Sequence, residues 1–220
     1  MGLSEEPIAH RFCSDMTHGL TMRLDASLEL FNYWNSTRGA DDAPLRSQID
    51  PGAIRHILPQ IFILETGQDS DPRFRLAGTT ICSLFGRELR DTAFSSLWTG
   101  RGAEKAVYVA VAVMDRVAPA LLDATGQPPS GRPSTFEVVL LPMRSSPDRC
   151  DRLLGCLVSA KTNTRLASQP LAGLRLDRSR MLDGLTGLPD TEVTEQQASS
   201  SAWFARGIGL SFAVRRALHL

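Results

Sequence analysis

The chain has 220 residues, and its 24 lysines and arginines are balanced by 24 aspartates and glutamates, so the formal net charge is zero. A neutral chain without a long basic stripe in its central region does not fit electrostatic capture of nucleic acid, and the length fits one moderate domain with extensions. The sequence contains no apolar run of about 18 residues and no signal-peptide pattern, which predicts a soluble, cytoplasmic protein.

Four cysteines, Cys13, Cys82, Cys150 and Cys156, are scattered along the chain. They do not show the paired spacing that is typical of structural zinc sites. We therefore expect reduced thiols and no metal site.

The first 22 residues lack an apolar period and are predicted to be a flexible leader to a domain that spans residues 23–182. An amphipathic helix is predicted over residues 24–38, because apolar side chains recur there at spacings of three and four, and Gly39 should end it. The apolar stripe consists of Leu24, Leu28, Phe31 and Trp34. Either the sheet of the same chain or the same helix of a second copy would bury it.

A short helix of about two turns is predicted after Asp50 and Pro51, because the aspartate can cap free amides and proline fits the first helical position. Pro59 should end this helix. Residues 61–66 then predict a strand with apolar side chains on both faces, which indicates a position that is central or covered on both sides.

Turn-forming residues 67–72 predict a hairpin between that strand and a second strand at residues 74–77. Strict alternation in the second strand places Phe74 and Leu76 on one face and the two neighbouring arginines, at positions 73 and 75, on the other.

Two helices are predicted after the hairpin. The first is short, begins with Thr79 or Thr80 as its cap and ends at Gly86. Residues 103–116 fit two patterns, because their alternate valines suit a strand and their alanine spacing suits a helix. The helix is favoured, since the segment is longer than an ordinary strand, is rich in alanine and has Glu104 in its first turn.

Three more strands are predicted, near residues 120–124, 136–141 and 153–159. A turn at residues 145–148 makes the last two an antiparallel hairpin. Beyond residue 161 the pattern weakens, although three leucines between positions 171 and 176 suggest an edge strand and residues 179–182 suggest a turn of helix.

Residues 183–220 are predicted to be a linker followed by a basic amphipathic tail. In this tail Trp203, Leu210, Val214 and Leu218 recur at helical intervals beside three arginines and no acid. Two glycines weaken the helix, so it should form on contact with another surface.

Several blocks of the sequence, taken in order, are similar to one known family. They are residues 33–35 (YWN), 43–51 (APLRSQIDP), 74–79 (FRLAGT), 84–89 (LFGREL), 97–98 (LW) and 140–142 (LLP). Over about residues 28–182 the chain resembles the small stand-alone PAS proteins of bacteria. The resemblance implies an α+β fold, a five-stranded antiparallel sheet with helices on one face, and a role in signal transduction without catalysis.

The resemblance also implies a cavity between the helices and the sheet, which in PAS domains holds haem, flavin, a small metabolite or nothing. Arg75 and Arg46 are the polar candidates for anchoring an anionic ligand. The apolar lining would be formed by Phe62, Leu64, Leu76, Phe85, Phe94, Val107, Val111 and Met114. The alternative is that these side chains fill the core without a ligand.

Two cofactors of PAS domains are not expected in this chain. Residues 103–116 contain no histidine that could serve as an axial haem ligand, and His56 is the only histidine in the central part of the chain. Cys82 lies in the sequence TICSLF, which lacks the Asn-Cys-Arg type of motif of flavin photosensors, and we predict that it is a small core residue.

Residues 183–189 (DGLTGLP) resemble the opening motif of diguanylate cyclase domains, but the Gly-Gly-acidic-acidic-Phe signature is absent. No serine-histidine-aspartate set or phosphate-binding loop is recognisable either, so no enzymatic activity is predicted. We expect a non-catalytic PAS regulator that contacts a signalling protein such as a histidine kinase and binds at most an unknown small molecule. The alternative is a membrane-surface adaptor attached through residues 203–220. A homodimer through residues 24–38 is one of the two alternatives for that helix.

Overall fold

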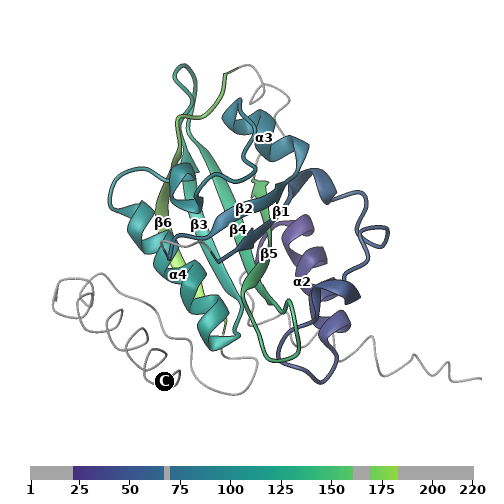
Figure 1. Cartoon of the computed structure of the whole chain (residues 1–220). Coiled ribbons are helices and arrows are strands. Elements are labelled where there is room, and N and C mark those ends of the chain that lie inside the picture. Colours follow the sequence, from purple (N-terminus) through teal and green to yellow (C-terminus); the bar gives the residue numbers. More distant parts are fainter. Residues whose placement is uncertain (1–21, 67–69, 161–168, 183–220) are drawn as a thin grey trace, which may run out of the picture.

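The computed structural model of the chain describes residues 22–66, 70–160 and 169–182. The predicted linker and basic tail lie outside these residues, as does nearly all of the predicted leader. In the described part, six strands form one antiparallel sheet in the order β2-β1-β5-β4-β3-β6. Figure 1 shows this sheet with short helices packed against it, which confirms the α+β fold class.

The helix α2 (Asp25–Arg38) confirms the amphipathic helix predicted from residue 24, and Gly39 follows it with φ of 59°. Glycine suits this position because a positive φ costs it no strain from a Cβ atom. The buried stripe consists of Ser27, Leu30, Phe31 and Trp34. It is shifted from the predicted stripe, since Leu24 and Leu28 are only half-buried.

Residues 51–57 form consecutive turns, so the predicted helix of two turns is wrong. Backbone amides here donate to carbonyls three residues earlier, as from Ile57 to Ile54. The Asp50 carboxylate accepts from the Gly52 amide at 2.8 Å and therefore closes a local turn instead of capping a helix. Short 3-10 helices lie on either side, η1 (Arg46–Gln48) and η2 (Leu58–Gln60).

The predicted hairpin is formed by β1 (Ile61–Glu65) and β2 (Arg73–Ala77), which pair in antiparallel fashion. The pairing has a bulge, because Ile63 is opposite Leu76 while the next residue of β1, Leu64, is opposite Phe74. The extra residue reverses the alternation within β2. Phe74 is fully buried, whereas Leu76 is 46% exposed, so the prediction that both lie on one face is wrong.

Three helical segments follow the hairpin: α3 (Thr79–Phe85), η3 (Phe94–Leu97) and α4 (Gly102–Arg116). The helix α4 confirms the helical reading of the ambiguous segment. Gly86 ends α3 with φ of 62°, as predicted, but the residue before the helix is Gly78, and neither threonine caps it. A Cβ at Gly78 would lie 2.3 Å from the Pro59 carbonyl oxygen, so close backbone approach requires this glycine.

The rest of the sheet is formed by β3 (Ala120–Gly126), β4 (Ser134–Met143), β5 (Arg152–Ser159) and β6 (Leu174–Met181). The first three confirm the predicted strands, and β4 pairs with β5 as expected. The sixth strand extends the expected five-stranded sheet, because β6 pairs with β3 at its edge. The predicted turn of helix at residues 179–182 is wrong, since the ladder with β3 continues to Met181.

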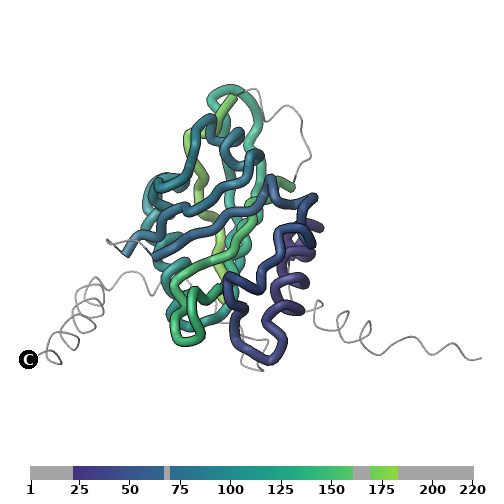
Figure 2. The backbone as a smooth tube through the Cα atoms, turned by 45° about the vertical axis from the view of Figure 1, so that its right-hand side comes forward, coloured from purple at the N-terminus to yellow at the C-terminus, as the bar shows by residue number. Residues whose placement is uncertain are grey.

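The sheet separates two apolar layers that alternate residues of the same strands build. The inner layer lies between the sheet and α3, η3 and α4, and includes Val138 and Leu140 of β4. The outer layer lies between the sheet and α2 with its neighbouring turns, and includes Val139 and Leu141. Figure 2 shows α2 beside the sheet, apart from α4. The two layers are the places where a ligand or a partner can be sought.

Candidate functional site

Four aromatic rings pack against one another in the inner layer, where the ligand cavity was expected. Phe62 of β1 meets Phe74 of β2 with ring centroids 5.6 Å apart, and both rings contact Phe94 of η3, at 6.3 and 6.0 Å. Trp98 packs edge-on against Phe94 at 5.6 Å. Spacings of this size are those of favourable aromatic pairs in a packed core.

A glycine of β5 makes room for this aromatic cluster. A Cβ at Gly155 would lie 2.3 Å from Cζ of Phe62, so the phenylalanine ring rests directly on the strand backbone. Gly155 is also the register partner of Phe62 across the β1–β5 ladder. The glycine and the ring are therefore one packing unit.

The predicted lining residues are divided between the inner layer and the surface. Phe62, Leu64, Phe85, Phe94 and Met114 are buried together in the inner layer.

Other predicted residues lie elsewhere. Val107 and Val111 are half-buried, because the core-facing stripe of α4 consists of Ala106, Val109, Ala110, Val113 and Met114. Leu76 is exposed at the sheet edge, because the bulge in the β1–β2 pairing turns its side chain away from the inner layer.

The two predicted anion anchors do not face the inner aromatic cluster. Arg75 lies on the edge strand β2, and its guanidinium is 3.7 Å from a carboxylate oxygen of Glu65, with the arginine side chain 53% exposed. An ion pair with this exposure contributes little stability. Arg46 is half-buried in η1, where its backbone amide donates to the Arg144 carbonyl at 2.8 Å.

One polar atom of the inner layer was not anticipated from the sequence. The indole Nε1 of Trp98 is buried and has no hydrogen-bond partner among the described residues. A buried N–H without an acceptor is uncommon and costs free energy. Trp98 lies next to Leu174 in an isolated bridge, so the donor is held between the aromatic cluster and the start of β6.

Cys82 of α3 is half-buried and packs against the inner layer. Its Sγ lies 3.8 Å from the Ala77 carbonyl oxygen and 3.6 Å from Oε1 of Glu88. Burial raises the pKa of the thiol, so Cys82 is protonated at neutral pH. The pKa of the Glu88 carboxyl is lowered, because the Arg90 and Leu89 amides donate to it. Among the described residues, no group of three or more histidine, cysteine, aspartate or glutamate side chains could hold a metal ion.

The four residues predicted as an interface of α2 also differ in burial. Phe31 and Trp34 are buried against the sheet, and Trp34 Nε1 donates to the Pro142 carbonyl at 2.8 Å. The guanidinium of Arg38 lies 5.2 Å from the centre of the Trp34 ring. These two aromatic residues are therefore buried by the sheet of their own chain, which is one of the two alternatives that the sequence left open. Leu24 and Leu28 remain half-exposed.

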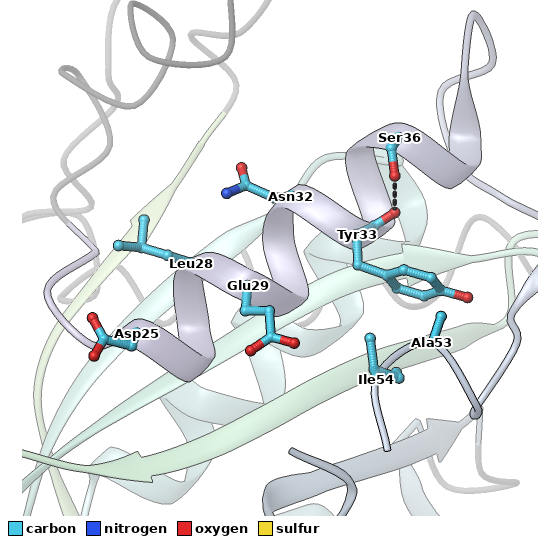
Figure 3. A pocket seen from close by; sticks show the side chains of 8 residues that line it. All are labelled: Asp25, Leu28, Glu29, Asn32, Tyr33, Ser36, Ala53 and Ile54. Carbon is cyan, nitrogen blue, oxygen red and sulfur yellow. Dashed lines mark hydrogen bonds between the residues drawn. The ribbon is translucent and has the colours of Figure 1, made fainter. Parts of the chain in front are cut away.

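The outer surface of α2 carries a groove that sequence reasoning did not identify. We define the α2 groove by Asp25, Leu28, Glu29, Asn32, Tyr33, Ser36, Ala53 and Ile54. It is open to solvent and has a volume of about 570 Å³. Figure 3 shows Glu29 and Tyr33 pointing from the helix toward Ile54 and Ala53 of the adjacent turn. The groove is thus built from two segments that are separate in the sequence, α2 and the turns at residues 51–57.

Fixed polar contacts shape this groove. The Tyr33 hydroxyl accepts from the Asp50 amide at 2.6 Å and lies 3.3 Å from the Asp50 carbonyl oxygen, which joins the turn to the helix. Glu29 lies 2.7 Å from the ring of His56, a residue of the adjacent turn that does not itself line the groove. Asp25 and Glu29 are one helical turn apart, so two carboxylates line the same edge.

The beginning of α2 is fastened to the sheet by charged groups. The Arg23 amide donates to the buried Glu137 carboxylate at 3.0 Å, and the Arg23 guanidinium lies 2.7 Å from Asp123. Arg180 of β6 lies 3.9 Å from the other oxygen of Asp123. Asp123 and Glu137 face each other across the β3–β4 ladder, and the arginine contacts offset the repulsion of two neighbouring carboxylates.

Comparison with known proteins gives one family. A family model described as PAS domain matches residues 22–158. No protein with a curated description matches the chain. In the described part of the chain, none of the helices has the length and apolar character needed to cross a bilayer.

Solved structures of light-oxygen-voltage proteins are similar to the chain at low identity. A domain studied with a flavin analogue has 13% identity and a TM-score of 0.41, and the match covers 50% of this chain and 84% of that chain. The light state of the blue-light photoreceptor Aureochrome1 has 11% identity and a TM-score of 0.39 over 50% and 88% of the two chains. The Rhodobacter sphaeroides LOV protein has 12% identity and a TM-score of 0.39 over 53% and 72%.

Proposed function

The chain belongs to the PAS domain family, a family of sensory and signalling modules, over residues 22–158, and on that premise we propose that it is a non-catalytic regulator that acts by binding another protein. The observation that carries the proposal is the contrast between a closely packed inner layer and an open α2 groove. A protein partner can reach the groove without any rearrangement of the core.

The chemistry of the groove defines the partner. Leu28 and Ile54 supply apolar contact surface, while Asp25 and Glu29 place two carboxylates along one edge. An amphipathic helix with basic residues beside its apolar stripe complements such a groove. We propose that this helix belongs to a cytoplasmic signalling protein such as a histidine kinase.

The charged side chains of the described residues support a non-catalytic role. Asp151 lies 2.9 Å from Arg149, and Asp177 lies 3.0 Å from Arg175, with each arginine side chain 71% exposed. Pairs in which the arginine is solvent-exposed are ordinary structural ion pairs of modest strength. They do not converge on a cleft in the way that catalytic acids and bases do.

Binding measurements with purified full-length chain test the proposal. A panel of purified histidine kinases is immobilised, and affinity and autophosphorylation are measured with the native chain and with groove variants. Ser36→Trp fills the groove from an exposed position, and Tyr108→Arg changes an exposed residue of α4 as a matched control. We expect the groove variant to lose a kinase that the control still binds. Equal binding by both variants, or no kinase bound by the native chain, would contradict the proposal.

A small ligand in the inner layer is the second candidate function, and the unpaired Trp98 Nε1 supports it. A ligand acceptor would satisfy this donor, and the aromatic rings would have to separate to admit it. A thermal-shift screen with metabolites and flavins tests this reading. A compound that stabilises the native chain more than Trp98→Phe supports it, and a screen without any stabilising compound removes it.

A further inference from the structure

We propose that residues 203–220 of this chain bind in the α2 groove and compete there with the protein partner. The inference rests on the proposed function only in taking the groove as a contact surface, and it does not depend on which partner binds. The occupant is a segment of the chain outside the described residues, and its charge, its apolar side chains and the point where the described chain ends all support this assignment.

The charges of the groove and of this segment are complementary. Asp25 is exposed and Glu29 is half-buried, and both line the groove. Residues 203–220 contain Arg206, Arg215 and Arg216 and no aspartate or glutamate. Opposite charges arranged along two surfaces favour their encounter and fix their register.

The apolar side chains of the two partners also match. Trp203, Leu210, Val214 and Leu218 recur at helical intervals, and the groove offers Leu28 and Ile54 beside the ring of Tyr33. A helix of the segment's 18 residues would extend about 27 Å, enough to cover the length of α2, which is about 21 Å. Binding in the groove would also give this amphipathic segment the contact surface that its helix requires.

The described chain ends near the beginning of α2. The Leu182 amide donates to the Pro119 carbonyl at 2.7 Å, and Arg180, two residues earlier, lies 3.9 Å from Asp123. The same carboxylate lies 2.7 Å from Arg23, which precedes Asp25 by two residues. The chain therefore leaves the sheet beside the groove edge that carries Asp25.

The length of the connection is sufficient. Residues 183–202 lie between the end of the described chain and the basic segment. Twenty residues can span at most about 65 Å, well beyond the length of α2. A tethered segment reaches an effective concentration on the order of millimolar, so even a weak contact would be occupied. A partner helix must displace the segment, which makes the groove self-inhibited.

Photo-crosslinking in the purified full-length chain tests this proposal without any partner. The photoreactive residue p-benzoylphenylalanine replaces Ser36 at the groove edge, and mass spectrometry identifies the peptides that become joined to it. We expect peptides from residues 203–220 joined within one chain. The same residue in place of Tyr108 on α4 provides the background, because Tyr108 is 50% exposed and lies outside the groove.

Charge reversal separates specific docking from chance proximity. Asp25→Lys with Glu29→Lys should lower the crosslinked fraction by about fivefold, and changing the three arginines of the segment to glutamate should restore it. The matched control is Glu104→Lys with Asp115→Lys, two exposed acids of α4, which should leave the fraction unchanged. Circular dichroism confirms that each variant is folded.

Several outcomes would overturn the proposal. They are equal crosslinking from positions 36 and 108, no effect of charge reversal, and crosslinks only between two chains. A fourth such outcome is that the full chain sediments with vesicles of anionic lipid and that reversing the groove charges leaves this vesicle binding unchanged. The segment would then bind a membrane surface. Any of these outcomes would overturn the docking of residues 203–220 without affecting the proposed function, which the kinase-binding measurement tests separately.

Discussion

The inner and outer layers are built from alternate residues of the same strands, yet they differ in chemistry. The inner layer is held by contacts among Phe62, Phe74, Phe94 and Trp98, and the buried indole N–H of Trp98 is unpaired. The outer layer contains a paired indole, a buried carboxylate that accepts from the start of α2, and an open groove on its far side. The difference teaches that in this PAS domain aromatic rings pack together on the side where a ligand cavity was expected, while the open groove lies on the α2 side.

The largest effect is expected from removing a ring of the inner layer. Phe62→Ala should lower the free energy of unfolding by about 3–5 kcal/mol, because it deletes a fully buried ring and leaves a cavity. Gly155→Ala should also destabilise, since its Cβ would lie 2.3 Å from that ring. The double variant should lose less than the sum of the two. Urea unfolding measures all three, and additive losses would show that the two residues are not one packing unit.

A smaller loss is expected from the outer layer. Trp34→Phe keeps most of the ring but leaves the buried Pro142 carbonyl without its donor, at a cost of about 1–3 kcal/mol. The matched control is Tyr108→Phe, which removes a hydroxyl from a half-exposed side chain of α4. The same unfolding titration compares them. If the two variants were equally stable, α2 would not be fastened to the sheet through its indole.

The outer layer should also respond to alkaline pH through Cys156. Burial raises the pKa of this thiol to about 12 from its ordinary value of 9.0. Between these values the unfolded chain has lost the proton and the folded chain has kept it, so stability that is present at neutral pH is lost as pH rises through this window. From about pH 8 to about pH 10, the native chain should lose about 1 kcal/mol more than Cys156→Ala. Parallel losses in both chains would show that the thiol is accessible to water.

The smallest effect is expected at the sheet edge. Leu76→Lys should change the free energy of unfolding by no more than about 0.5 kcal/mol, because the bulge in β2 exposes this leucine. Leu64→Thr, at a fully buried position of the neighbouring strand, should cost several times more. A large loss from Leu76→Lys would mean that a second surface covers this edge.

Local patterns predicted the elements well where one physical rule decides. The spacing of apolar residues in α2, the burial of both faces of β1 and the glycine that ends α3 each depend on a few neighbouring residues. The helical reading of α4 held because its length and alanine content outweigh the alternation of its valines.

The failures depend on contacts that a local pattern does not contain. The bulge opposite Ile63 follows from pairing two strands, so alternation within β2 alone misplaced Leu76. Which stripe of α4 faces the sheet is decided by β6 and η3, and this left Val107 and Val111 half-exposed. The α2 groove joins a helix to turns that were predicted to be helical, so no sequence motif could indicate it.

Native mass spectrometry of the full-length chain, purified without denaturation, tests the packed inner layer most directly. A core filled by its own aromatic rings predicts the mass of the polypeptide alone, in whatever number of copies it assembles. A small molecule retained in a one-to-one ratio, and lost in the Trp98→Phe variant, would contradict this and place a ligand among the rings.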